Sequence, residues 1–98
     1  MPAFLFELEL PAISDEIMNI IPAQRSLVSA LLVDGKIISY SVSQARNMLW
    51  CVIDSETEQE AMDIIVMFPL YPFFTDIVCH PLLFHSNLPV SFPGVSLN

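Results

Sequence analysis

The chain has 98 residues, with 11 acidic residues against 3 basic ones, so its formal net charge at pH 7 is −8. This length fits a single domain, and a hydrophobic share of 54% excludes an intrinsically disordered chain. So few basic residues on an acidic chain make nucleic acid and anionic membrane surfaces poor partners, and we expect neither.

The first two elements are a strand and a helix. Residues 3–10 alternate with a period of two, which predicts a half-buried strand. Ser14 can cap a helix, but Pro22 lies within the apolar pattern that follows and cannot donate a backbone hydrogen bond. We therefore expect a short turn before Pro22 and a helix from about Pro22 to Asp34, ended by Gly35 in a left-handed conformation.

Two strands joined by a hairpin follow. Residues 36–43 alternate again, with Tyr40 and Ile37 on opposite faces, and the polar residues 44–47 form a link short enough for a hairpin. Residues 48–53 are apolar on both faces, which is typical of a strand in the middle of a sheet.

A second helix and a fourth strand complete the pattern. Asp54 or Ser55 is expected to cap the helix, and Pro69 to end it. The glutamates within residues 56–60 are interpreted as a solvated first turn that the helix dipole favours, not as a cation site. Residues 73–79 are predicted to form the last strand, with Pro81 at a bulge or an edge position near its end.

This order of elements is typical of the ferredoxin-like α+β fold, a four-stranded antiparallel sheet with both helices on one face. The other face cannot be polar, because residues 48–53 are apolar on both sides. We therefore expect two copies to pack face to face as a dimeric α+β barrel. The domain is placed in residues 1–86, and residues 87–98 are expected to form an extended tail that packs on a partner subunit.

Hydropathy supports association and argues against a membrane protein. The mean hydropathy of +0.62 is high for a domain of this size, which predicts that a second copy buries some apolar surface. The richest apolar stretch, residues 64–74, contains two prolines and is shorter than the roughly 20 residues of a membrane-spanning helix. No charged segment of the secretory type opens the chain, so we expect no signal peptide.

Three segments carry a resemblance to a known family. Residues 47–54 read N-M-L-W-C-V-I-D, residues 68–74 read F-P-L-Y-P-F-F, and residues 78–85 read V-C-H-P-L-L-F-H. With the first helix running into Gly35, the chain resembles the muconolactone delta-isomerases over residues 3–85. The Pro-Leu-aromatic-Pro turn is the most specific part of this likeness.

The resemblance implies a small cytoplasmic enzyme that acts in the degradation of aromatic compounds. Such an enzyme isomerises an unsaturated lactone bearing a carboxylate by moving a proton, without a metal or an organic cofactor. The resemblance also implies a homodimer or a larger homo-oligomer of ferredoxin-like barrels. The expected ligand is therefore a small carboxylate-bearing molecule.

The resemblance further implies where the site lies. The family carries a Glu-Lys pair on its first helix, and the corresponding positions here are Gln24 and Arg25. Arg25 would hold the substrate carboxylate through its planar guanidinium; the alternative is a surface arginine paired with an acid. Gln24 cannot act as a base, so we expect it to bind substrate and Glu7 or His85 to move the proton.

The remaining candidates can each be interpreted in two ways. Glu9 and Asp76 are alternative bases if their strands line a desolvated barrel, but on an edge strand they would be solvated. His80 titrates near neutral pH and could bind substrate or be structural. Tyr40 and Trp50 could bind the ligand or fill the core, and a cavity filled by Trp50 would argue against a pocket.

Other residues point to no chemistry of their own. Arg46 lies in the predicted hairpin link and is interpreted as a solvated residue. Cys51 and Cys79 are expected to be reduced residues among apolar neighbours, and no metal-binding motif includes them. The rival to an isomerase is a non-catalytic binding or assembly module, in which the interior of the barrel is simply a packed interface.

Overall fold

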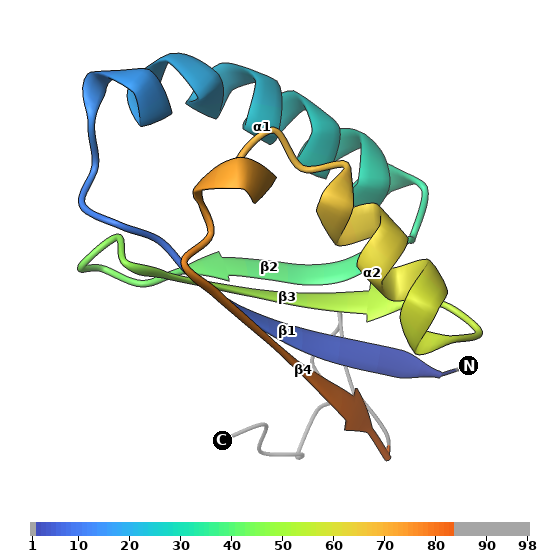
Figure 1. Ribbon diagram of the computed structural model, residues 1–98. Coiled ribbons are helices and arrows are strands. Elements are labelled where there is room, and N and C mark those ends of the chain that lie inside the picture. Colours follow the sequence, from blue (N-terminus) through green and yellow to red (C-terminus); the bar gives the residue numbers. More distant parts are fainter. Residues whose placement is uncertain (1, 84–98) are drawn as a thin grey trace, which may run out of the picture.

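The computed structural model describes residues 2–83 and shows a four-stranded sheet with two helices on one of its faces (Figure 1). In chain order the elements are β1 (Ala3–Glu9), α1 (Asp15–Val33), β2 (Ile37–Val42), β3 (Met48–Asp54), α2 (Glu58–Val66), the 3-10 turn η1 (Tyr71–Phe73) and β4 (Asp76–Leu82). The strands are antiparallel in the order β2-β3-β1-β4. The predicted ferredoxin-like fold is confirmed, and the tail expected over residues 87–98 lies outside the described residues.

The core lies between the sheet and the helices. β1 turns Phe4, Phe6 and Leu8 to that side, and all three are buried as the alternation predicts. Phe6 pairs with Cys51 on β3 and with Cys79 on β4, so β1 is an interior strand. The alternative in which β1 is an edge strand is therefore wrong, whereas the interior position predicted for β3 is confirmed.

Helix α1 is continuous through Pro22, so the expected start near that proline is wrong. The helix begins at Asp15, where the Ser14 Oγ accepts a hydrogen bond from the Ile17 N–H at 3.2 Å. Ile17 and Leu31 are both buried on the same helix, one on each side of the proline. Because packing of this face outweighs one missing backbone bond, the proline is tolerated inside the helix.

The end of α1 follows the prediction. Gly35 adopts a φ of +79°, the left-handed conformation that glycine enters without strain. Its N–H bonds the Leu32 carbonyl at 3.1 Å, and the Lys36 N–H bonds the Leu31 carbonyl at 3.0 Å. These bonds satisfy carbonyls of the last helical turn and direct the chain into β2.

A bulge near the start of β2 changes which of its side chains reach the core. Ile37 pairs with Ile53, but Ser39 pairs with the adjacent Val52, so the pairing gains one residue on the β2 side. Ile37 and Tyr40 consequently both pack with the core, although simple alternation places them on opposite faces. The alternation expected for β2 is wrong at this point, and the bulge directs Tyr40 toward α1.

The second helix begins later than expected. Thr57, not Asp54 or Ser55, is its N-cap, because the Thr57 Oγ1 accepts a hydrogen bond from the Glu60 N–H at 3.1 Å. Ser55 instead donates its hydroxyl to the Thr57 carbonyl at 2.8 Å. The acidic first turn is exposed, as its interpretation as a solvated turn requires.

The last strand also begins later than expected. Residues Tyr71–Phe73 form the 3-10 turn η1, so β4 starts at Asp76 and not at Phe73. β4 lies at the edge of the sheet, where Pro81 is tolerated as predicted.

Candidate functional site

A cavity of about 390 Å³ lies between α1 and the helix-covered face of the sheet. Its volume is at the small end of the range found for ligand pockets. The buried side chains of Leu10, Leu49 and Leu70 contribute to its apolar lining. Ile13 and Met18, which are exposed, also line it, so the cavity opens to the surface.

The positive charges of the chain gather at this cavity. Arg25 of α1 and Arg46 of the β2–β3 hairpin both line it, and they are two of the three basic residues in the chain. No aspartate or glutamate of residues 2–83 is among the lining residues. A local positive charge on a chain of net charge −8 attracts small anions to this position.

Gln24 links segments that line the cavity through two side-chain hydrogen bonds. Its side chain is only 2% exposed, and its Oε1 accepts a hydrogen bond from the Leu70 N–H at 3.1 Å. A backbone N–H can only donate, so this bond assigns the orientation of the amide. The Nε2 therefore donates to the Tyr40 hydroxyl, at 3.3 Å. Gln24 thus joins α1 to β2 and to the Pro-Leu-Tyr-Pro turn that follows α2.

Tyr40 lines the cavity, and its hydroxyl can donate a hydrogen bond. Burial raises the pKa of its hydroxyl above 10.0, so the group is protonated at neutral pH. Because the oxygen accepts from Gln24, the hydroxyl proton is directed away from Gln24. The ring packs edge-on against Phe68, with 6.4 Å between the centroids, which restricts its position. The polar residues that line the cavity are therefore Tyr40, Gln24, Arg25 and Arg46, a set suited to an oxyanion.

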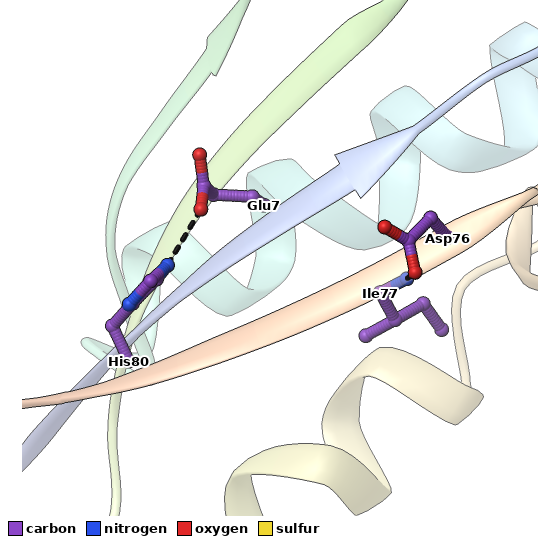
Figure 2. A network of polar contacts seen from close by, with 4 residues as sticks. All are labelled: Glu7, Asp76, Ile77 and His80. Carbon is purple, nitrogen blue, oxygen red and sulfur yellow. Dashed lines mark hydrogen bonds and ion pairs between the residues drawn. The ribbon is translucent and has the colours of Figure 1, made fainter.

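Three other predicted site residues lie together on the helix-free face of the sheet. Glu7 Oε2 and His80 Nε2 form a pair at 2.5 Å between β1 and β4 (Figure 2). Trp50 stands opposite Glu7 on the neighbouring strand β3. The predicted residues thus divide into two groups on opposite faces of the sheet, so Glu7 cannot act as a base inside the cavity beside Arg25 of the same chain. Trp50 does not fill the cavity.

Glu9 and Asp76, the alternative carboxylate bases, form hydrogen bonds away from the cavity. His85 lies outside the described residues. Asp76 is exposed and accepts a hydrogen bond from the N–H of its neighbour Ile77 at 3.0 Å (Figure 2). Glu9 accepts one from the Thr75 hydroxyl at 2.8 Å. Neither carboxylate lines the cavity.

The described residues contain no group of three or more His, Cys, Asp or Glu side chains placed to hold a metal ion.

A second hollow, of about 350 Å³, lies beside Lys36 and acidic residues of α2. Cys51 and Cys79 are both unbridged, as expected for reduced residues. No helix within residues 2–83 combines the length and the apolar character needed to cross a membrane.

Two residues of the cavity have roles that sequence reasoning missed. Arg46 is exposed, as its interpretation as a solvated turn residue predicts, but it also lines the cavity. No pattern in the sequence indicates this, since its position depends on how the hairpin folds. Gln24 is buried at the same helical face as Ile17, Val28 and Leu31. That spacing is visible in the sequence and could have identified a buried polar residue.

No family model matches the chain, and no curated protein sequence matches it. Solved structures with a similar fold include a muconolactone isomerase, with a TM-score of 0.67 and 18% identity, covering 94% of this chain and 98% of that one. They also include a 5-chloro-2-hydroxyhydroquinone dehydrochlorinase from Burkholderia phenoliruptrix in complex with 2,5-dihydroxybenzoquinone. This match has a TM-score of 0.65 and 11% identity, and it covers 82% of this chain and 91% of that one. The chain therefore has the fold of muconolactone isomerase, which confirms at the level of fold the resemblance seen in its sequence.

Proposed function

We propose that the chain binds a small carboxylate-bearing molecule in the cavity between α1 and the sheet, with Arg25 as the anchor of the carboxylate. The observation that carries this proposal is that Arg25 and Arg46 both line a largely apolar cavity. Within residues 2–83, no aspartate or glutamate lines it. Both arginines are exposed, so solvent screens their attraction for the carboxylate, and the apolar walls contribute by covering the rest of the ligand. The planar guanidinium can donate two parallel hydrogen bonds to a carboxylate, which fixes the orientation of the ligand.

Replacing Arg25 with glutamine is expected to weaken binding of muconolactone by about 10- to 100-fold, the usual effect of removing a charged hydrogen bond. The measurement is isothermal titration calorimetry at one ionic strength. Lys36→Gln is the matched control, because it removes the same charge at a residue that does not line the cavity. Equal losses in the two variants would show that only the net charge of the chain matters.

The second candidate is proton-transfer isomerisation of a lactone in the cytoplasmic breakdown of aromatic compounds. The Tyr40 hydroxyl in the cavity favours it, because such a reaction develops negative charge on a carbonyl oxygen. A base removes a proton from the carbon next to the carbonyl, and the electron pair moves onto that oxygen. Tyr40 would stabilise the resulting enolate until the proton returns at another carbon.

The base for this reaction is proposed to come from outside the described cavity wall. No carboxylate or imidazole of residues 2–83 lines the cavity, and Gln24 cannot take a proton. His85, which lies outside the described residues, is our candidate. A cavity that binds the ligand without turning it over would identify the chain as a binding module.

Replacing Tyr40 with phenylalanine is expected to lower the turnover of muconolactone by about 100-fold or more while ligand affinity changes little. Tyr71→Phe is the control, since Tyr71 packs against the same core but does not line the cavity. An isomerase assay that finds Tyr40→Phe as active as wild type excludes Tyr40 from the reaction.

Replacing His85 with glutamine is expected to lower the turnover of muconolactone in the same assay by about 100-fold through loss of the base.

We also propose that the helix-free face of the sheet joins two copies in a homodimer, with residues 87–98 packing on the partner. Support comes from the fold and from the side chains of this face, where Trp50 and Val78 flank Glu7 in register. Val78 is 38% exposed in the single chain, so association would remove apolar surface from water.

A further inference from the structure

Arg46 has an unusual backbone conformation. Its φ is +63°, and it is the only non-glycine residue of residues 2–83 with a positive φ. It occupies the last position of a turn in which its N–H bonds the Ser43 carbonyl at 2.9 Å, a position where glycine is favoured. An arginine here carries a backbone strain that glycine would not.

The surrounding hairpin holds Arg46 in this conformation. The Ser43 Oγ accepts hydrogen bonds from the Asn47 N–H at 3.2 Å and from the Met48 N–H at 3.0 Å. The Asn47 carbonyl accepts one from the Leu10 N–H at 2.9 Å, which ties the hairpin to the segment after β1. Arg46 is therefore presented to the cavity from the hairpin, while Arg25 is presented from α1.

Arg25 and Arg46 line one cavity and both are exposed, so an anionic group of a ligand can reach either of them. A single carboxylate held by Arg25 leaves the charge of Arg46 uncompensated. A second anionic group on the same ligand would pair with it. No acidic side chain of residues 2–83 lines the cavity to take that role within the chain.

We propose that Arg46 is a second anion-binding residue and that the cavity selects small acids carrying two anionic oxygen groups, of which dicarboxylates are the simplest. This inference rests on the proposed function, because it assigns the first anionic group to Arg25. A glycine at this position would relieve the backbone strain but would leave the second anionic group without a partner.

The test compares dicarboxylates of three to six carbons with monocarboxylates of the same lengths by calorimetry at one ionic strength. At least one dicarboxylate is expected to bind wild type about 10-fold or more tightly than its monocarboxylate counterpart. In Arg46→Gly the affinity for dicarboxylates is expected to fall more than the affinity for monocarboxylates, so that this preference drops below about twofold. The melting temperature of Arg46→Gly is expected to be unchanged or higher, because glycine suits the backbone.

The outcomes separate this inference from the proposed function. If Arg25→Gln abolishes the binding of monocarboxylates and wild type shows no preference for any dicarboxylate, the inference is wrong and the proposed function stands. A dicarboxylate preference that survives in Arg46→Gly overturns the role of Arg46. If no acid binds wild type, both are wrong. Lys36→Gln, with the same charge change away from the cavity, must retain the preference.

Discussion

Replacing Gln24 with methionine is expected to lower the free energy of unfolding by about 2–4 kcal/mol. Methionine has a similar length and fills the same space, so little cavity is created. It offers neither the acceptor that satisfies the Leu70 N–H nor the donor that binds the Tyr40 hydroxyl. The Leu70 N–H would then be left without its partner in a position where Leu70 is 2% exposed.

The measurement is urea denaturation of wild type and variant. Asn19→Met is the matched control, because it places the same side chain at an exposed position of the same helix. It is expected to change the stability by less than about 0.5 kcal/mol. If Gln24→Met proves as stable as this control, Gln24 does not hold the turn at Leu70 against α1.

The second large effect is a loss of stability at alkaline pH. Burial raises the pKa of the Cys51 thiol from 9.0 to about 12. Between these values the unfolded chain releases a proton that the folded chain retains, so the folded state becomes less stable as pH rises. Each pH unit changes the free energy by about 1.4 kcal/mol, which gives a loss of about 4 kcal/mol between pH 9 and pH 12. Burial of the Tyr40 hydroxyl acts in the same direction above pH 10.0.

Urea denaturation at a series of values from pH 8 to pH 11 measures this dependence. Cys51→Ala is expected to flatten the decline, whereas Cys79→Ala should retain most of it, because Cys79 is only partly buried. The comparison uses the slope of the free energy of unfolding against pH, because alanine at position 51 also removes packing and lowers stability at every pH. Parallel slopes for wild type and Cys51→Ala would show that the thiol does not cause the decline.

Local patterns were sufficient to predict the architecture. The alternation of β1 follows from the period of two, and it identified Phe4, Phe6 and Leu8 as core residues. Gly35 ended α1 as predicted, because a left-handed cap depends on one residue and its immediate neighbours. The order of six elements then allowed few arrangements, and the ferredoxin-like sheet is one of them.

Local patterns failed where tertiary packing opposes a local preference. Pro22 predicted a helix start, but burial of Ile17 and Leu31 carries the helix through it. A bulge that alternation cannot reveal brings Tyr40 to the same side as Ile37. The effect on the site is direct, because this bulge allows Tyr40 to reach Gln24.

The composition of 98 residues with 3 basic side chains already indicated that any anion site would depend on very few residues. The sequence by itself also determined the elements and their order, since these follow from periodicity and capping over short stretches of chain. Only the tertiary structure decided that Arg25 and Arg46 line one cavity, while Glu7 and His80 lie on the other face of the sheet. That division depends on strand register and on a left-handed turn, which join residues far apart in the chain.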